Sequence, residues 1–282
     1  MEFKKYDDPE EFVRENEELI LEKEWLNNLM AGNYLDAVKE GINENWLLAR
    51  ITEGEQTELI LFLRKPWKML LYSPTDNLSE ELFKFAAEEV YKIEPNLDGV
   101  NTEKEMSRMF ANEYCKIANR IWKVRFEMRI LVLEKILEGN LREDVIYRRA
   151  EMKDKETLIW QIRAFHKEAL HEEMSYEEAE ERFNKYMQKG YYLLEKDGKI
   201  VAQASTNRDL IKGKSIGSVY TLEEERGKGY AYNVVYRASK EILENGAEYC
   251  VLFTDDANPI SNHVYEKIGY ERKVDTTEID FE

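Results

Sequence analysis

The heptapeptide ERGKGYA, residues 225–231, combines the residue types that bind a phosphate group. Gly227 and Gly229 leave room for an anion to approach the main chain, and Arg226 and Lys228 supply positive charge. A helix that starts here adds unpaired N–H groups and a partial positive charge at its N-terminus. Because the heptapeptide lies between a strand-like and a helix-like segment, the pattern predicts a cradle for a phosphate or a diphosphate.

Two common nucleotide motifs do not fit these residues. A P-loop requires glycine at position 222 and serine or threonine at position 229, where this chain has leucine and glycine. A dinucleotide fingerprint requires a third glycine at position 232, which is tyrosine. Glycine-rich surface turns are common, so the heptapeptide alone leaves an ordinary turn open as an alternative.

The elements that must position this loop alternate between strand and helix from residue 145 onward. The loop follows a predicted strand at 214–221 and precedes a predicted helix at 232–246. Around them we expect further strands at 145–151, 191–206 (a hairpin turning at Asp197–Gly198), 248–256 and 271–281, and helices at 154–173, 175–190 and 261–269. Ser175 and Glu178 have capping-box spacing. The order predicts a mixed α/β (α+β) fold, a central sheet flanked by helices.

The first half of the chain has a weakly similar layout. Its patterns predict one helix over 9–33 that stops at Gly32–Asn33, a hairpin over 45–51 and 57–65, and a strand over 122–133. They also predict a helix over 78–93, capped by Ser79 or Asn77, and a helix over 102–119 with a capping box at Thr102 and Glu105. No counterpart of RGKG is present, so this half reads as a copy that lacks the phosphate loop.

Composition and charge narrow the function class. Of 282 residues, 43% are hydrophobic, which is enough for a proper core. The formal net charge of −17 argues against a nucleic-acid partner and mildly favours a cationic substrate. Two cysteines and three histidines have no metal-ligand spacing, so we expect no metal and reduced thiols. The charged start and the short apolar runs predict a cytoplasmic protein without a signal peptide or a membrane span.

Two landmarks together resemble the GCN5-related N-acetyltransferase (GNAT) family. The pattern Arg226-x-x-Gly229-x-Ala231, directly after the strand, resembles the family's acetyl-CoA loop, Gln/Arg-x-x-Gly-x-Gly/Ala. Downstream, NPISNHVYEKIGY at 258–270 is similar to the family's last helix. The resemblance is particularly to bacterial two-domain members. It implies the GNAT fold, with a degenerate GNAT-like N-terminal domain at 1–140, a catalytic domain at 141–282, and a boundary in the polar segment 138–144.

The resemblance also implies roles for individual residues. Acetyl-CoA would be the co-substrate, and the implied cofactor-binding residues are Val219, Tyr220, Thr221, Arg226, Gly227, Lys228, Gly229, Tyr230, Ala231, Asn258 and Asn262. Lys228 has a solvated loop lysine as its alternative, and Asn258, which precedes a proline, has a capping role as its alternative. Tyr265 matches the family's proton donor to the departing thiolate, with a core-facing helix tyrosine as its alternative.

The acceptor and the base stay open at this stage. Glu168, Glu172, Glu173, His166 and His171 lie near the end of the helix that often borders the acceptor pocket in the family. We expect transfer of the acetyl group to a primary amine, on a small molecule or a protein, by direct attack in a ternary complex. A longer acyl donor, and an acyl-CoA-binding sensor or interaction protein without turnover, are the alternatives. A homodimer is compatible with the sequence.

Overall fold

The computed structural model describes residues 1–40, 45–76 and 78–282, and the chain divides into two compact units. The N-terminal unit comprises residues 1–130, 255–257 and 273–282, and the C-terminal unit comprises residues 131–254 and 258–272. Three strands, β6, β11 and β12, therefore contribute residues to both units. The sequence-based boundary between residues 140 and 141 stays a prediction.

The two halves of the chain repeat one order of elements: strand, two helices, three strands, helix, strand, helix, strand. The first series is β1 (Glu2–Tyr6), α1 (Pro9–Glu22), α2 (Asn28–Glu40), β2 (Trp46–Glu53), β3 (Gln56–Arg64), β4 (Leu70–Tyr72), α3 (Glu80–Ile93), β5 (Gly99–Glu103), α4 (Lys104–Ala118) and β6 (Trp122–Leu133). The second series is β7 (Ile146–Arg149), α5 (Lys155–Phe165), α6 (Tyr176–Lys189), β8 (Tyr191–Lys196), β9 (Lys199–Asp209), β10 (Gly213–Thr221), α7 (Tyr230–Glu244), β11 (Tyr249–Asp255), α8 (Pro259–Ile268) and β12 (Glu271–Phe281). The similar layout of the two halves is thereby confirmed.

In the N-terminal unit, β1, β2, β3 and β4 form an antiparallel sheet, and β5 pairs with β12. Apolar side chains of α3 and α4 pack on these strands. The predicted hairpin is confirmed as β2 and β3. Ser79 caps α3, because its side chain accepts a hydrogen bond from the N–H of Leu82. The alternative cap, Asn77, lies outside the described residues.

Two local predictions in this unit are wrong. The helix expected over 9–33 is two helices, α1 and α2, and α2 continues past Gly32–Asn33 to Glu40. Between them, the side-chain amide of Asn27 donates to the carbonyl of Ile20 at 3.0 Å, a local bond that competes with the helical ladder. The capping box at Thr102 does not form, because this residue is still in β5 and its hydroxyl donates to the carbonyl of Leu71.

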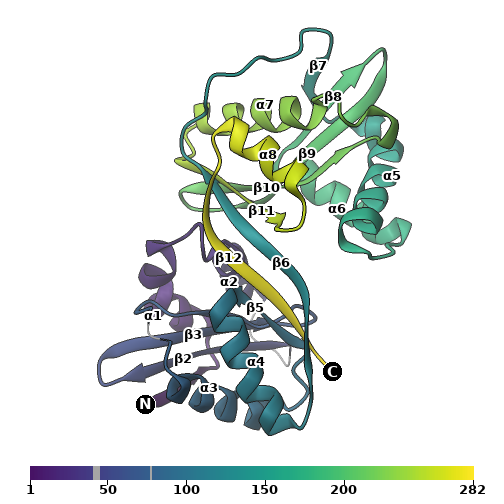
Figure 1. Cartoon of the computed structure of the whole chain (residues 1–282). Helices are drawn as coiled ribbons and strands as arrows, with labels where there is room; N and C mark the ends of the chain where they lie inside the picture. The colour runs from purple at the N-terminus through teal and green to yellow at the C-terminus, as the bar shows by residue number, and fades with distance from the viewer. Residues whose placement is uncertain (41–44, 77) are drawn as a thin grey trace. The chain divides into compact units, whose positions relative to one another are not determined.

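The C-terminal unit carries helices on both faces of a mixed sheet (Figure 1). Its strands follow the order β11-β10-β9-β8-β7, with β10 and β11 parallel and the other pairs antiparallel. Alternate residues of β8 face opposite ways: Tyr191 and Leu193 pack with α5 and α6, whereas Tyr192 and Leu194 pack with α7 and α8. The predicted helices and strands of this half are confirmed, α5 continuing into a π-helical turn, η2 (His166–Leu170).

The chain-reversal signals of this half are also confirmed. Ser175 and Glu178 exchange both bonds of a capping box at the start of α6, and Gly190 ends that helix. Asp197 and Gly198 turn the β8–β9 hairpin with positive φ angles of 50° and 78°. These signals act within a few residues, so the sequence contained all the information that they need.

Candidate active site

A gap opens between β10 and β11 in the C-terminal unit. The two strands pair in parallel only at Gly213–Tyr249, Lys214–Cys250 and Ser215–Val251, although β10 continues to residue 221. The same stretch of β10 is bulged: its register with β9 shifts between Gly217 and Tyr220, and Ser218 has a φ of +50°. The bulge and the end of pairing leave main-chain groups of β10 free of ladder bonds on the β11 side.

The glycine loop lies at the end of this gap. After β10, a short 3₁₀ turn, η3 (Glu223–Glu225), leads to Gly227 and Gly229, whose φ angles are +74° and +82°. A Cβ atom at either glycine would meet no other atom within 4 Å. The side of the loop that a side chain would fill is therefore open, as an anion cradle requires.

The start of α7 has main-chain N–H groups that can bind a ligand. Gly229 is the N-cap, and no side chain among the described residues caps it. Side chains cap α1, α3, α6 and α8, whereas α4 and α5 also start without such a cap. The N–H groups of Tyr230 and Ala231 belong to the first turn and have no acceptor within the helix. The loop therefore presents main-chain donors and the positive end of a 15-residue helix.

The cations of the loop are paired with acidic residues. The Nζ atom of Lys228 lies 2.9 Å from a carboxylate oxygen of Glu225 and donates to the carbonyl of Glu224 at 3.0 Å. Arg226 pairs through Nη2 with Glu168, a residue of η2. An incoming diphosphate would meet these cations only after an exchange of partners.

Helix α8 borders the same region with one buried face. Asn262 and Tyr265 lie on that face, exposed by 5% and 7%. Asn258 caps α8 by accepting from the N–H of Ser261 at 3.1 Å, which is the capping role that the sequence also allowed. Burial raises the pKa of Tyr265 to about 12, so its hydroxyl is protonated and able to donate at neutral pH.

The five candidates for the base are separated by the fold. Glu168 reaches the end of β10, where it accepts from the hydroxyl of Tyr220 at 3.1 Å. Glu173 pairs with Lys167 at 2.7 Å on the surface. Glu168 thus contacts two of the predicted cofactor-binding residues, Tyr220 and Arg226. Glu172 has a carboxylate oxygen near the ring of His166, and His171 adopts a left-handed conformation at the end of η2.

His166 is a core residue. It is 3% exposed, and burial, together with the nearby positive charge of Arg182, lowers its pKa to about 4. Its Nδ1 atom lies 3.7 Å from a carboxylate oxygen of Glu172. It is therefore neutral at physiological pH, and its burial removes it as the base that an acceptor would meet.

The buried histidine predicts a pH-dependent stability. Its folded pKa of about 4 lies below the ordinary value of 6.5, so the unfolded chain binds the proton more readily. The free energy of unfolding therefore has its full value above pH 6.5. It falls by about 3 kcal/mol in total as the pH falls to 4, because the unfolded chain binds the proton and the folded chain does not. Urea unfolding at pH 7.5 and 4.5 should show a smaller loss in His166→Gln than in the wild type. The exposed His263→Gln serves as the control, and an equal loss in all three proteins would contradict the assignment.

The sequence reading missed three residues of the site. Trp160 of α5 is 55% exposed and meets the ring of Tyr220 edge-on, with centroids 6.4 Å apart. The guanidinium of Arg142 donates to the carbonyl of Lys228 at 3.1 Å, and Lys196 joins it beside the loop. Arg142 and Lys196 belong to no recognisable motif. Only the fold brings these two residues to the loop at 225–231.

These basic residues line a hollow of ≈ 440 Å³ next to the glycine loop. Its lining includes Arg142, Lys196, Lys199, Lys228 and the ring of Tyr230. Carboxylates lie close to the cations, for example Asp144, which is 2.6 Å from Arg142 and 2.8 Å from Lys196. The surroundings of the loop are therefore rich in charge of both signs.

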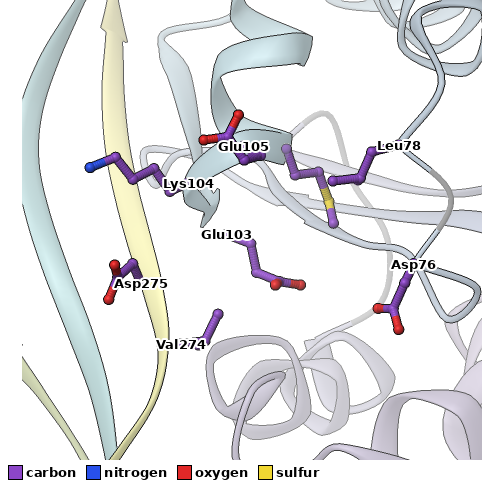
Figure 2. A pocket seen from close by; sticks show the side chains of 8 residues that line it. Asp76, Leu78, Glu103, Lys104, Glu105, Val274 and Asp275 are labelled. Carbon is purple, nitrogen blue, oxygen red and sulfur yellow. The ribbon is translucent and has the colours of Figure 1, made fainter.

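The N-terminal unit has a hollow with a mainly acidic lining beside its β4–α3 loop, the position that the glycine loop takes between β10 and α7. It measures ≈ 400 Å³ and lies at the loop after β4 and the start of α4. Figure 2 shows the carboxylates of Asp76 and Glu103 turned toward one another across it. Glu105 and Asp275 add two more carboxylates, against one lysine, Lys104. Such a lining repels a diphosphate, which is consistent with the missing phosphate loop of this half.

The described residues contain neither a metal-binding cluster nor a membrane-spanning helix. Among residues 1–40, 45–76 and 78–282, no group of three or more histidine, cysteine, aspartate or glutamate residues is arranged to hold a metal ion. Within the same residues, none of the helices has the length and the apolar character needed to cross a bilayer.

Comparison with known proteins agrees with this geometry. The sequence of residues 155–270 matches the Acetyltransferase (GNAT) family. None of the curated proteins matches the chain. The matched segment begins at α5 and ends just after α8, so it contains the gap, the glycine loop and the helix that carries Tyr265.

Solved structures resemble the chain over its full length. A Drosophila protein superposes with a TM-score of 0.68 at 14% identity, covering 99% of this chain and 98% of the other. A GCN5-related N-acetyltransferase from Sphaerobacter thermophilus gives 0.68 at 11%, covering 99% and 95%. A tandem GNAT protein from the clavulanic acid biosynthesis pathway gives 0.59 at 10%, covering 100% and 98%. At these identities the likeness concerns the fold, and it extends to both units.

Proposed function

We propose that the protein is an acetyl-CoA-dependent N-acetyltransferase, on the premise that residues 155–270 match the Acetyltransferase (GNAT) family. It transfers the acetyl group to a primary amine by direct attack in a ternary complex. The observation that carries the proposal is the open glycine loop on the uncapped start of α7, placed at the end of the gap between β10 and β11. A thioester arm in the gap and a diphosphate on the loop would use both features at once.

The donor is bound mainly by main-chain groups. The pantetheine arm takes the place of a strand beside β10, along Val219 and Thr221, where pairing with β11 has ended. The diphosphate lies on the N–H groups from Gly227 to Ala231. Asn262 lines the arm from α8. Lys228 adds charge after it leaves Glu225, and this exchange costs little free energy because the lysine side chain is 49% exposed.

The chemistry requires three proton movements and one bond exchange. The ammonium form of the acceptor first loses a proton, and the neutral nitrogen attacks the thioester carbon. Main-chain N–H groups near the bulge at Ser218 stabilise the oxyanion that develops. The carbon–sulfur bond then breaks, the nitrogen releases its second proton, and the hydroxyl of Tyr265 donates a proton to the departing thiolate. The products are an acetamide and free CoA.

The acceptor is a cationic primary amine. The net charge of −17 attracts cations to the protein, and the exposed ring of Trp160 beside Tyr220 offers an aromatic surface on the side of α5. A carboxylate, Glu168, lies next to these rings. An ammonium group is complementary to that combination of π-faces and negative charge.

The proposal predicts one donor site per chain. Calorimetric titration with CoA should give one molecule bound per chain, because the corresponding hollow of the N-terminal unit is acidic. ATP and NADH, which lack the pantetheine arm, should not compete. A screen of primary amines with acetyl-CoA, followed by thiol release, should then identify an acceptor. Binding without turnover on any amine would indicate a CoA sensor, and absence of CoA binding would refute the proposal.

A further inference from the structure

Arg226 occupies the path of the donor. The N–H of Leu222 donates to Val201 of β9 at 3.1 Å, so the carbonyl of the preceding residue, Thr221, points away from β9 and toward the gap. The Nε atom of Arg226 donates to that carbonyl at 3.2 Å. Its guanidinium therefore lies at the end of the gap, next to the glycine loop, where a diphosphate would arrive.

Glu168 holds Arg226 there from the side of α5. One carboxylate oxygen pairs with the guanidinium, and the other accepts from the hydroxyl of Tyr220 at 3.1 Å. Arg226 also lies over the ring of Tyr220, with its guanidinium carbon 5.7 Å from the centroid. The Tyr220 ring in turn meets Trp160. Glu168 thus joins the donor loop to the aromatic surface proposed for the acceptor.

The pair can exchange partners easily. The side chains of Arg226 and Glu168 are 46% and 43% exposed, and ion pairs of that exposure contribute little to stability. A diphosphate offers a guanidinium more charge and more acceptor oxygens than one carboxylate does. After the exchange, Glu168 would keep its hydrogen bond from Tyr220. Its negative charge would no longer be shared with Arg226 and would be available to an acceptor beside the rings of Tyr220 and Trp160.

We propose that Glu168 is the carboxylate that binds the ammonium group of the acceptor, and that Arg226 masks it until the diphosphate of the donor takes Arg226 over. This inference rests on the proposed function, and it adds a coupling between the two substrates. By linkage, the donor tightens acceptor binding, and the acceptor tightens donor binding by the same factor. The donor must carry a diphosphate, so pantetheine alone leaves Glu168 masked.

The first test measures CoA affinity by calorimetry in four proteins: wild type, Glu168→Gln, Arg226→Gln and the double variant. Glu168→Gln should bind CoA about fivefold more tightly, because a neutral amide replaces the carboxylate that competes with the diphosphate for Arg226. Arg226→Gln should bind about tenfold more weakly, and the added Glu168→Gln change should then have no effect. Glu173→Gln, which removes a neighbouring carboxylate paired with Lys167, is the control and should leave the affinity unchanged.

The second test uses spermidine as the cationic probe, with tryptophan fluorescence as the readout. Saturating CoA should tighten spermidine binding at least about fivefold in the wild type, and the same amount of pantetheine should not. Glu168→Gln should abolish the effect of CoA. A merely structural role of Glu168 in bracing the loop would instead weaken CoA binding in that variant.

Either of two results would overturn the inference: CoA affinity that is unchanged or reduced in Glu168→Gln, or spermidine binding that CoA does not tighten in the wild type. Neither result affects the proposed function, provided that wild-type protein binds CoA with one molecule per chain. Loss of CoA binding by the wild type would refute the proposed function itself.

Discussion

Replacing Gly229 with aspartate should weaken acetyl-CoA binding by about 100-fold or more, while the protein still folds. Aspartate tolerates the left-handed conformation that this position adopts, with φ +82° and ψ 13°. At the start of a helix, its negative charge is favourable by about 0.3–1 kcal/mol. The same charge about 5 Å from a phosphate costs about 3 kcal/mol at an effective dielectric constant of about 20, so affinity should fall about 100-fold or more.

Gly229→Asn is the matched control for this variant. Asparagine has nearly the same shape and the same tolerance of positive φ, but it carries no charge. We expect it to weaken binding only modestly, and calorimetry with thermal unfolding of both variants measures the two effects separately. An equal loss of affinity in both variants would mean that the bulk of the side chain, and not its negative charge, prevents binding. Unchanged affinity in both would remove the loop from the donor site.

The parts of the fold that the sequence predicted are those with local causes. The capping box at Ser175, the Asp197–Gly198 turn and the cap at Ser79 each depend on residues a few positions apart, and all three form. Period-two alternation placed β6 correctly because a strand needs only its own pattern. The glycine loop could also be predicted, since a positive φ angle favours glycine and both loop glycines adopt one.

The parts that were missed depend on contacts between distant segments. Thr102 and Glu105 have capping-box spacing, but β5 extends through Thr102, whose hydroxyl bonds to Leu71 of the neighbouring strand. The pairing of Arg226 with Glu168 joins residues 58 positions apart, and no spacing rule distinguishes Glu168 from Glu172 in one charged helix. The sequence therefore predicted which residue types form the site, and the fold was needed to select among identical types.

Replacing Tyr265 with phenylalanine should slow acetyl transfer by about 10²–10⁴-fold without weakening CoA binding. The variant removes one oxygen from a side chain that is 7% exposed and keeps the ring contact with Tyr270, whose centroid lies 5.9 Å away. What is lost is the proton donated to the departing thiolate. Because burial raises the pKa of Tyr265 to about 12, the donor stays protonated, and the advantage of the wild type should persist from pH 7 to pH 9.

Tyr270→Phe tests whether the effect belongs to the position of the hydroxyl. Tyr270 is also buried in the same core, but its hydroxyl lies 2.9 Å from that of Ser239. Its loss should reduce stability by about 1 kcal/mol and leave the turnover within about twofold of the wild type. Steady-state kinetics with calorimetry on both variants separates the roles. Normal turnover in Tyr265→Phe would make that tyrosine a packing residue, whereas weaker CoA binding with unchanged kcat would assign it to donor recognition.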